Sequence, residues 1–252
     1  MTKKNFTVSV VTVTTNNEST IARTMESILA QKYTNIEHII VDGISTDRTL
    51  EIIDSYKPKY EKKGIVLKLI SEPDKGPYDA MNKGVSIATG DIIGILNSDD
   101  CYDKDALSNV FEAVSNHDAD IYMGAIRIHN GQNQIIEKHA KNTRYKTTRH
   151  YNHPAMFVTK DCYKTVGKYG LTNVHSDYGW YLKALKMGKK VYIIDHVLAD
   201  FYTGGWSSKK SFSNTLARIP AKYQVYKENG YSKLYFFECF AQEIAKYILL
   251  KK

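Results

Sequence analysis

Hydrophobic and polar positions form two repeating patterns along the first 100 residues. Continuous runs of β-branched and aliphatic residues, typical of strands buried on both faces of a sheet, alternate with stretches whose apolar residues recur every three or four positions, as in helices. The runs predict strands over 8–15, 36–43, 64–72 and 91–100, and the stretches between them predict helices over 19–31, 45–60 and 76–88. Ser19 and either Ser45 or Thr46 are the expected helix caps, and Pro58 is expected to close the second helix. This alternation predicts an α/β fold with a mostly parallel central sheet and helices on both faces.

The second half of the chain shows the same patterns less regularly. They predict helices over 107–117 and 176–188, strands over 120–130, 153–159 and 190–195, and a loop over 198–211. Near the C-terminus, one face of a predicted helix over 232–250 collects Leu234, Phe237, Ala241, Ile244 and Ile248. We therefore expect a C-terminal helical extension after the α/β body.

Charge is distributed unevenly over this pattern. The chain has a formal net charge of +8, and the segment from Trp206 to Lys252 holds nine Lys and Arg against three Glu, a net +6. The first 205 residues are therefore nearly neutral, which argues against a nucleic-acid-binding body. The basic, aromatic tail is typical of a helix on anionic lipid, and the alternative is a helix that packs on its own domain or on a second subunit.

Two further features concern the cellular compartment. No apolar run approaches the roughly 20 residues needed to span a bilayer, and the first residues lack a signal-peptide cleavage pattern. The three cysteines are far apart and without metal-ligand spacing, which is typical of reduced thiols. We expect a cytoplasmic protein that makes peripheral contact with the inner face of the plasma membrane.

Polar side chains follow each of the first four predicted strands. They are Thr14, Thr15 and Asn16 after the first strand, Asp42 after the second, the segment 72–75 after the third, and Asp99 and Asp100 after the fourth. In sheets of this type ligands bind beyond the carboxyl ends of the strands. Four such ends favour a ligand site over four solvated loops.

The adjacent acids Asp99 and Asp100 are the most unusual of these residues. Two carboxylates 4 Å apart repel each other by about 4 kcal/mol at an effective dielectric constant of about 20. Successive side chains of an extended strand point to opposite sides, so the two acids serve different partners. Oxygen ligands without His or Cys neighbours favour Mg²⁺ or Mn²⁺. The alternative is that both acids only cap the helix that begins near 103–105.

The N-terminal four-fifths of the chain resembles a known family. Six blocks occur in a specific order over about residues 7–206: SVVTVTTNNESTI, SILAQKYTNIEHIIVDGISTDRT, SEPDKGPYDAMNKGVSIATGDIIGILNSDD, NHPAMFV, SDYGWYLKALKMG and FYTGGWS. Together they resemble the family-2 inverting glycosyltransferases of the GT-A fold, which use nucleotide sugars. The block EPDKGPYDAMNKG is most similar to members that build bacterial capsule, exopolysaccharide or O-antigen.

The resemblance implies roles for the strand-end residues. Thr14 and Asp42 match positions that hold the nucleotide base, while Thr15 stands where many members carry Tyr. Asp74 and Lys75 match the loop that approaches the ribose, and Asp99 matches a donor contact. The implied donor-binding set is Thr14, Thr15, Asn16, Asp42, Asp74, Lys75 and Asp99. The implied metal-binding set is Asp100, Asp99 and His153, although a buried histidine with a structural role is an equal interpretation of the last.

Asp177, at the start of the predicted helix over 176–188, matches the family's catalytic base. An inverting transfer is a single displacement in which a base takes the proton of the acceptor hydroxyl. The alternative for Asp177 is an ordinary acid at a helix N-terminus, and His175 is an alternative base. Gly204 and Gly205 fit a loop over the donor, with Ser207 and Ser208 near its phosphates. Trp180 and Trp206 fit sugar stacking or a place in the core.

These observations predict a metal-dependent inverting glycosyltransferase that moves a sugar from a nucleoside diphosphate, UDP, to a glycan or lipid-linked saccharide. Residues 1–205 form the transferase domain, with a nucleotide-binding half over 1–100 and an acceptor and catalytic half over 101–205, and 206–252 form the tail. A sugar-phosphate nucleotidyltransferase would need a Gly-rich basic loop after the first strand, which TVTTNNEST lacks. A non-catalytic nucleotide-sugar-binding protein is the alternative from another class.

Overall fold

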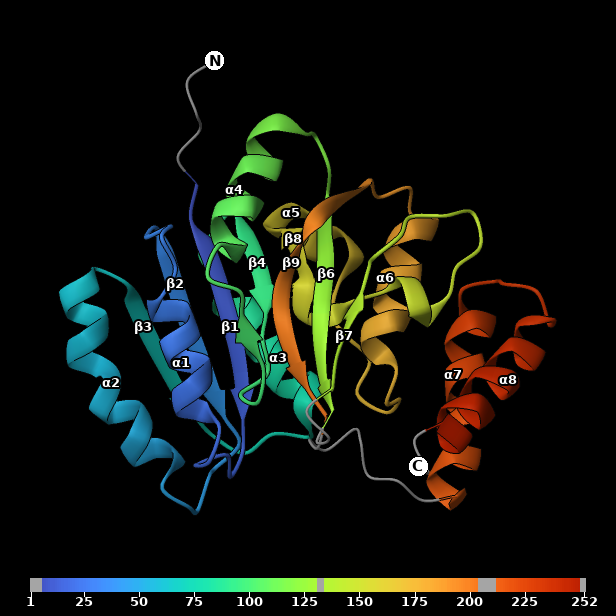
Figure 1. Ribbon diagram of the computed structural model, residues 1–252, viewed down its shortest axis with the longest axis horizontal. Helices are drawn as coiled ribbons and strands as arrows, with labels where there is room; N and C mark the ends of the chain where they lie inside the picture. Colours follow the sequence, from blue (N-terminus) through green and yellow to red (C-terminus); the bar gives the residue numbers. More distant parts are fainter. Residues whose placement is uncertain (1–5, 131–133, 204–211, 250–252) are drawn as a thin grey trace.

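The computed structural model describes residues 6–130, 134–203 and 212–249. In chain order the elements are β1 (Val8–Thr14), α1 (Ile21–Leu29), β2 (Ile36–Asp42), α2 (Thr49–Lys63), β3 (Val66–Ser71), α3 (Pro77–Ile87), β4 (Ile92–Ile95), β5 (Cys101–Tyr102), α4 (Ala106–Asn116), β6 (Ile121–Asn130), β7 (Gln134–Lys138), the short 3₁₀ helices η1 (Thr148–His150) and η2 (His153–Ala155), β8 (Met156–Thr159), α5 (Lys160–Val166), α6 (Ser176–Lys186), β9 (Val191–Tyr202), α7 (Phe212–Glu228) and α8 (Tyr235–Leu249). The predicted α/β fold with helices on both faces is confirmed (Figure 1).

The strands join in one sheet of order β3-β2-β1-β4-β8-β6-β9-β5, with β7 paired to β6. The first four strands are parallel, as expected, whereas β8 runs antiparallel to both β4 and β6. The chain moves outward from β1 to β3 and then returns to place β4 on the other side of β1. That reversal of direction, between β1 and β4, is where an open α/β sheet leaves a crevice for ligands.

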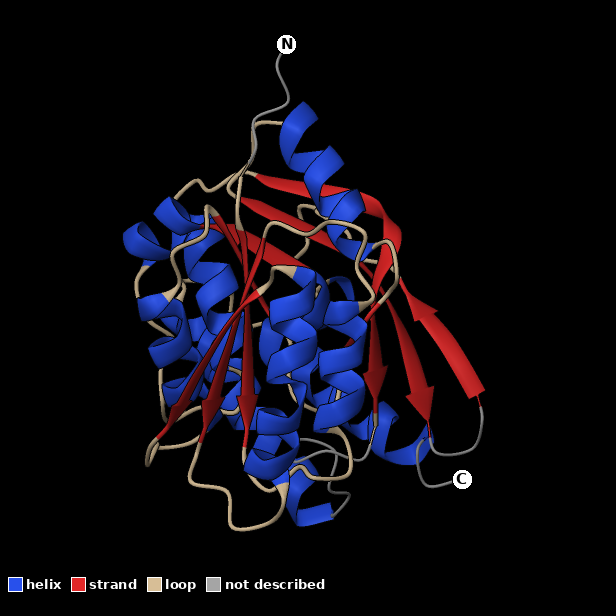
Figure 2. Cartoon of the chain, turned by 90° about the vertical axis from the view of Figure 1, so that its left-hand side faces the viewer, coloured by secondary structure: helices blue, strands red, loops and turns tan. Residues whose placement is uncertain are grey.

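Two hydrophobic cores lie on opposite faces of the sheet, because successive residues of a strand point to opposite sides. Val8 and Val10 of β1 pack with α1, α2 and α4, whereas Val11 and Val13 pack with α3, α5, α6 and α7. All seven residues of β1 and of β2 are buried. The strand arrows and covering helices are visible edge-on in Figure 2.

The second helix does not end at the proline, contrary to the prediction. Pro58 lies inside α2, which continues to Lys63 and ends at Gly64 in a left-handed conformation with φ 70°. The buried ring of Tyr60 anchors the turn beyond the proline, and its hydroxyl lies 2.8 Å from Nδ1 of His38. Tertiary contact therefore outweighs the local preference of proline. The helix caps also differ from the prediction, since neither Thr20 before α1 nor Arg48 before α2 makes a side-chain cap bond.

The expected loop over 198–211 is also wrong in part, because β9 continues to Tyr202. Asp200, the residue that interrupts the apolar pattern, lies opposite Arg127 of β6 in the strand register. The helix α7, which the hydrophobic pattern did not predict, packs between α6 and α8 (Figure 1). No helix within the described ranges is both long and apolar enough to cross a bilayer.

Candidate active site

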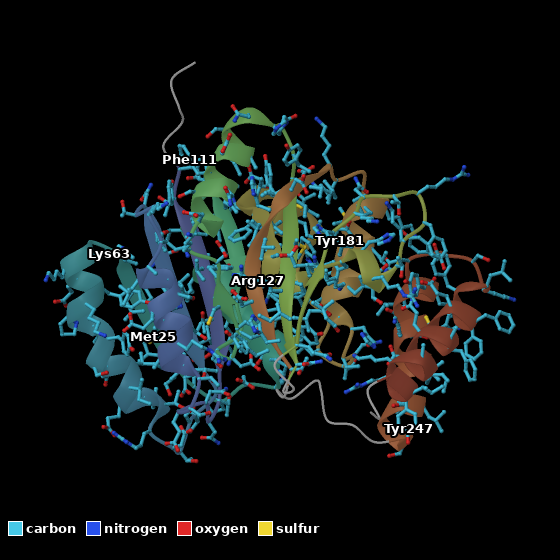
Figure 3. The ribbon with its side chains drawn as sticks, in the orientation of Figure 1. Met25, Lys63, Phe111, Arg127, Tyr181 and Tyr247 are labelled. Carbon is cyan, nitrogen blue, oxygen red and sulfur yellow. The ribbon has the colours of Figure 1, made fainter. Side chains whose placement is uncertain are left out.

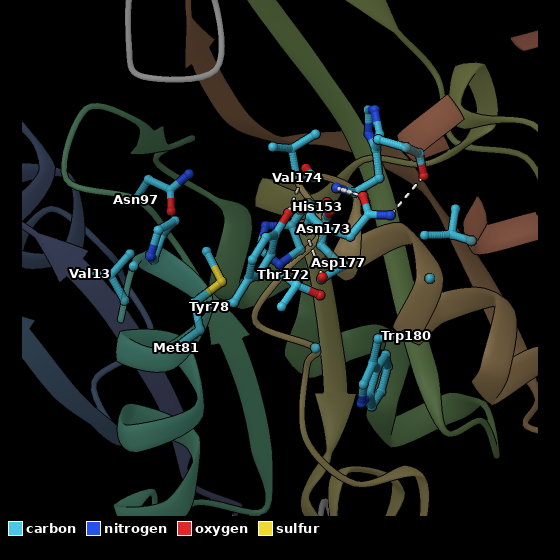
Figure 4. A pocket seen from close by; sticks show the side chains of 18 of the residues that line it. Val13, Tyr78, Met81, Asn97, His153, Thr172, Asn173, Val174, Asp177 and Trp180 are labelled. Atoms are coloured by element: carbon cyan, nitrogen blue, oxygen red, sulfur yellow. Dashed lines mark hydrogen bonds between the residues drawn. The ribbon is translucent and has the colours of Figure 1, made fainter. Parts of the chain in front are cut away.

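A cavity of about 1830 Å³ opens at the carboxyl edge of the sheet. Its walls come from the ends of β1 and β9, the loop after β4, the start of α3, and the helices α6, α7 and α8. Figure 4 shows the two sides, with Val13 and Asn97 on the sheet side facing His153, Asn173 and Asp177. Among the predicted donor, metal and base residues, Thr14, Thr15, Asp74, Asp99, His153 and Asp177 line this cavity, and so do the alternative candidates His175 and Trp180.

Asp42 is fully buried beneath this surface. Its carboxylate accepts hydrogen bonds from the backbone N–H of Ser45 at 3.0 Å, from the Ser45 hydroxyl, and from the Ser71 hydroxyl at 2.7 Å. These bonds join the ends of β2 and β3. Asp42 therefore fixes these two strand ends to each other, and it is not among the cavity-lining residues.

Gly43 shows how closely the strand ends approach one another. A Cβ atom at this position would lie 2.5 Å from Oδ2 of Asp74 and 2.5 Å from Oγ1 of Thr15. Such contacts are well inside van der Waals distance, so a side chain at 43 would displace both residues. Because Gly43 has no side chain, Asp74 and Thr15 can both approach it closely.

Asn16 and Lys75 lie outside the cavity lining. Asn16 has a left-handed backbone with φ 53°, and its Oδ1 accepts a hydrogen bond from the N–H of Thr46 at 2.8 Å. It fastens the first loop to the loop after β2. Lys75 is exposed, and its backbone N–H donates to Asp79 at 3.1 Å. Neither side chain contacts the other predicted donor residues in the described part of the chain.

Asp99 and Asp100 have different environments. Asp99 is half-buried and lines the cavity, while Asp100 is fully buried. Oδ1 of Asp100 accepts a hydrogen bond from the N–H of Tyr202 at 3.1 Å, but Oδ2 has no partner in the described residues. Burial, and then the charge of Asp99, raise the pKa of Asp100 well above its ordinary value. Burial also raises the pKa of Asp99. Both carboxylates would gain from a nearby cation.

A second buried acid in the same region is already paired. Asp200 accepts two hydrogen bonds of 2.8 Å from the Arg127 guanidinium, labelled in Figure 3, and lies 2.5 Å from Nε2 of His129. Burial alone would raise the pKa of Asp200, but the bonds from Arg127 and His129 outweigh it and the pKa is lowered. The contrast identifies Asp100 as the acid that lacks a counter-charge.

The charge of Arg23 in α1 acts on both acids of the pair. Its Nη2 donates to the backbone oxygen of Asp99 at 2.8 Å, and its guanidinium lies 3.6 Å from the ring centre of Tyr202. Arg23 therefore holds the loop after β4 through the backbone rather than through the carboxylates. The sequence reading gave no role to Arg23 or Tyr202, since neither stands in a polar strand end.

The donor atoms of Asp99 and Asp100 fit a divalent cation only in part. Two oxygen ligands and an unpartnered buried carboxylate oxygen suit Mg²⁺ or Mn²⁺. However, no group of three or more His, Cys, Asp or Glu that could hold a metal ion occurs in residues 6–130, 134–203 and 212–249. His153 therefore does not form such a group with the two acids. Its ring lies near those of Tyr151 and Tyr169, and the charge of Asp177 acts on its pKa.

Asp177 lies in the first turn of α6, as predicted, and lines the cavity across from Val13 and Asn97 (Figure 4). Its Oδ1 accepts a hydrogen bond of 2.9 Å from the hydroxyl of Tyr78, which also lies 2.9 Å from the backbone oxygen of Val174. Burial, and then the negative charge of Asp177, raise the pKa of Tyr78, so this hydroxyl stays protonated. The starts of α3 and α6, 99 residues apart in sequence, meet at this bond.

Two neutral imidazoles flank Asp177. Burial lowers the pKa of His175 to about 4 and lowers that of His153, while the charge of Asp177 opposes both shifts. Nε2 of each ring has no partner in the described residues. At neutral pH a histidine with such a lowered pKa is unprotonated and can accept a proton. His175 therefore stays the alternative base.

The loop before α6 is tied to α7 by Asn173. Its Oδ1 accepts from the N–H of His175 at 2.9 Å, and its Nδ2 donates to the backbone oxygen of Ala221 on α7 at 2.8 Å. The Ser176 hydroxyl donates to the backbone oxygen of Asn173 at 2.7 Å. The C-terminal extension therefore helps to position the loop that carries Asp177.

The remaining predicted residues divide into two groups. Trp180 is buried, and its indole N–H donates to the backbone oxygen of Gly167 at 2.6 Å, so its ring serves the core while one edge lines the cavity. The residues of the predicted donor loop lie outside the described part of the chain: Gly204, Gly205, Trp206, Ser207 and Ser208.

The sequence is similar to those of known glycosyltransferases. The model of the family described as "Glycosyl transferase family 2" matches residues 9–167. A "PGL/p-HBAD biosynthesis glycosyltransferase" of Mycobacterium bovis is 29% identical over 222 residues, which cover 84% of this chain and 83% of the relative. "Glycosyltransferase GlyG" of Streptococcus pneumoniae is 35% identical over 117 residues, covering 46% of this chain and 38% of that protein.

Solved structures show the same fold at lower identity. S. aureus TarS (residues 1–349) in complex with UDP-GlcNAc superimposes with a TM-score of 0.72 at 18% identity, over 94% of this chain and 71% of that chain. The mannosyltransferase PcManGT from Pyrobaculum calidifontis, in complex with GDP-Man and Mn²⁺, has a TM-score of 0.65 at 15% identity, over 96% and 75% of the two chains. Similarity at this level of identity concerns the fold.

Proposed function

The chain belongs to glycosyl transferase family 2 and has the GT-A fold, and on this premise we propose that it is an inverting, metal-dependent glycosyltransferase. It moves a sugar from a nucleoside diphosphate to the hydroxyl of a glycan or lipid-linked saccharide in surface polysaccharide synthesis. The observation that carries the proposal is the position of Asp177, a carboxylate in the first turn of α6 that lines the same cavity as Asp99 and the end of β1.

The donor lies at the sheet side of the cavity. The proposed donor-binding residues are Thr14, Thr15, Asn16, Asp42, Asp74, Lys75 and Asp99. Thr15 and Asp74 approach each other around Gly43, and Asp99 lines the cavity beside them. The nucleotide is proposed to be UDP, from the resemblance of the sequence blocks. The solved neighbours hold different nucleotides, UDP-GlcNAc in TarS and GDP-Man in PcManGT, so they support a nucleotide sugar without choosing the base.

A divalent cation, Mn²⁺ or Mg²⁺, is proposed to bind Asp100 together with Asp99, whereas the predicted third ligand, His153, forms no metal-binding group with these acids in the described residues. When bound, the cation would neutralise the diphosphate that leaves the sugar. The support from this chain is the unpartnered Oδ2 of Asp100 and the raised pKa values of both acids. In the structure the ring of His153 instead lies near Tyr151, Tyr169 and Asp177.

Asp177 acts as the base. The acceptor oxygen forms a bond to the anomeric carbon, the bond from that carbon to the diphosphate oxygen breaks, and Asp177 takes the hydroxyl proton. Tyr78 donates its hydrogen bond to Oδ1, which leaves Oδ2 to accept the proton. A base of this kind contributes about 100- to 10,000-fold to the rate.

The tail is proposed to keep the enzyme at the inner face of the plasma membrane. Its support is the basic composition of residues 206–252 together with exposed apolar residues such as Phe237. A homodimer through the same surface is the alternative. The division into 1–100, 101–205 and 206–252 stays a proposal, and the bond from Asn173 to α7 couples its last two parts.

A panel of nucleotide sugars, each with and without Mn²⁺, tests the proposal. The melting temperature of the protein measures donor binding, and release of the nucleotide measures transfer. The correct donor at a hundredfold excess over its Kd should stabilise the fold by about 2.7 kcal/mol, and only with the metal. Asp177→Asn should keep this shift and lose about 100-fold or more of the transfer rate. Asp161→Asn, at an exposed acid in the first turn of α5, is the matched control and should leave both unchanged.

Two outcomes would contradict the proposal. The absence of any metal-dependent shift with every donor would oppose a metal-dependent transferase. A normal transfer rate in Asp177→Asn would remove Asp177 as the base and turn attention to His175. A donor-dependent shift in a wild-type protein that neither transfers nor hydrolyses would instead favour the non-catalytic binding protein.

A further inference from the structure

The helices α7 and α8 form a wall of the cavity on the side of Asp177. Arg218, Ala221, Gln224 and Glu228 of α7 line it, together with Glu243 and Lys246 of α8. The two helices lie beside α6 at the end of the molecule away from β1 to β3 (Figure 1). The wall is therefore on the acceptor side of the cavity, away from the residues assigned to the nucleotide.

With Lys222 behind the lining, the described part of this wall holds three cations, Arg218, Lys222 and Lys246, against two acids, Glu228 and Glu243. Lys222 and Glu243 are both buried and form an ion pair of 3.2 Å, so the carboxylate already has its counter-ion. Lys246 lies within reach of the same carboxylate's field, but its ammonium group makes no ion pair within 4.0 Å and no hydrogen bond to the described residues. Arg218 adds a third cation near Lys246.

The pKa values show that these cations repel one another. Desolvation lowers the pKa of Lys246, Glu243 opposes the shift, and the charges of Arg218 and Lys222 add to it. Lys138, which donates to the backbone oxygens of Thr148 and Tyr151, has its pKa lowered to about 8 by burial and then by Lys246 and Lys222. An anion in the cavity would relieve this repulsion.

The charges of these lysines also act close to the proposed base, Asp177. The charge of Asp177 acts on both Lys138 and His175, and Lys222 and Lys246 act on His175. The side chain of Lys246 is exposed and lines the cavity. A group bound by Lys246 would thus belong to the molecule whose hydroxyl faces Asp177.

We propose that the acceptor carries a negatively charged group, a phosphate ester or a carboxylate, and that Lys246 and Arg218 bind it at the α7–α8 wall. This inference rests on the proposed function, because it names the class of acceptor for the same site. The wall lies inside the cavity, whereas Leu234, Phe237 and Ile248 are exposed on the outside of the helix pair. The anionic subsite is therefore separate from the surface proposed to meet a membrane.

Binding of a small anion to the full-length protein tests the subsite. Phenyl phosphate and benzoate are titrated at constant low ionic strength, by ligand-observed NMR, into protein saturated with UDP and Mn²⁺, so that the donor side is blocked. Lys246→Gln and Arg218→Gln should each weaken binding by about tenfold, the usual effect of losing one charge-assisted hydrogen bond. Affinity for UDP should stay within about twofold of the wild-type value, since these residues do not face the nucleotide.

Lys227→Gln is the matched control. It removes the same charge from an exposed lysine of α7 that does not line the cavity, and it should change neither affinity. Tighter binding of phenyl phosphate than of benzoate would identify a phosphate ester, as in a lipid-linked or phosphodiester acceptor. The reverse order would identify an acidic sugar. Either order supports an anionic acceptor.

Equal anion affinity in Lys246→Gln, Lys227→Gln and wild type would overturn the inference, as would the absence of anion binding to the UDP-saturated protein. Failure of the proposed function gives a different result. If UDP does not bind, the donor assignment falls, and titration of the ligand-free protein still measures the contribution of Lys246. The melting temperatures of the variants verify that they fold.

Discussion

Asp99 and Asp100 are neighbours in the sequence with different surroundings in the fold. The first lines the cavity, and the second is fully buried with one carboxylate oxygen unpartnered in the described residues. Asp200, also buried, is held by Arg127 and His129. A buried carboxylate without a counter-charge is costly, and Asp100 is a residue that a stability argument alone does not explain.

Asp100→Asn should therefore stabilise the metal-free protein at neutral pH. The folded state of the wild type raises the pKa of Asp100 above its unfolded value, so ionisation opposes folding at high pH, and this cost disappears as the pH falls towards 4. The variant should melt about 2–4 °C higher at pH 7.5, the shift that about 1 kcal/mol gives in a chain of this size, with a smaller difference at pH 4.5.

Calorimetry with and without Mn²⁺ measures both parts of this prediction. The metal should stabilise the wild type and leave Asp100→Asn unchanged, because the ligand has lost its charge. Asp54→Asn, at an exposed acid of α2 paired with Lys57, should behave as wild type in both tests. A variant that melts lower than the wild type, or that keeps the full Mn²⁺ response, would show that Asp100 has a purely structural role.

Tyr78 is a positioning residue for Asp177. Tyr78→Phe removes a hydrogen bond to a charged group, which is worth about 1.5–3 kcal/mol, so kcat should fall about tenfold or more. The Kd for the donor should not change. Tyr56→Phe on α2 is the control, and an unchanged kcat for Tyr78→Phe would assign the tyrosine to packing alone.

At the scale of single elements, α8 has two faces with different chemistry. Cys239 and Glu243 are buried on the inner face, where Glu243 pairs with Lys222 of α7. Phe237 and Ile248 on the outer face are 68% and 61% exposed, and Leu234 just before the helix is 72% exposed. These three belong to the apolar face predicted from the sequence. Removing α8 altogether would leave Lys222 buried without its partner, so substitutions test the outer face better than truncation.

The triple variant Leu234→Ser, Phe237→Ser and Ile248→Ser should lose binding to anionic vesicles. Burying one such side chain contributes about 1.5–3 kcal/mol, so the partition into phosphatidylglycerol-containing vesicles should fall at least about tenfold, measured by co-sedimentation. Val66→Ser, at an exposed residue of β3 at the other end of the sheet, should bind as wild type does. Equal sedimentation of all three proteins would sink the membrane proposal, and a change in oligomeric state would favour the homodimer.

At the scale of the whole molecule, the strand order decides where the parts of the site meet. The chain places β4 beside β1 on the side away from β2, and the antiparallel β8 then joins the N-terminal half to β6 and β9. The hydrogen bond between Tyr78 and Asp177 and the bond between Tyr202 and Asp100 cross this junction. One cavity can therefore bring residues 14 and 246 to opposite walls.

Much of the fold follows from the sequence alone. The runs of β-branched residues and the polar strand ends predicted β1 to β4, α1 to α3 and the edge where the cavity opens, because buried parallel strands and amphipathic helices have strong local patterns. The blocks of the first 206 residues indicated the family, and the family match confirmed it. Asp177 and Asp99, both predicted as site residues, line the same cavity.

Other features depended on contacts between distant residues. Pro58 lies within α2 because Tyr60 is anchored to His38, and β9 extends through Asp200 because Arg127 forms an ion pair with it and His129 hydrogen-bonds to it. The sequence by itself determined the elements, the sheet edge and the class of chemistry, since these follow from local periodicity and residue type. Only the tertiary structure decided that Asp100 lacks a counter-charge, that Tyr78 holds Asp177, and that the basic tail turns Lys246 into the cavity, since charge and hydrogen-bond partners are set by packing across long sequence separations.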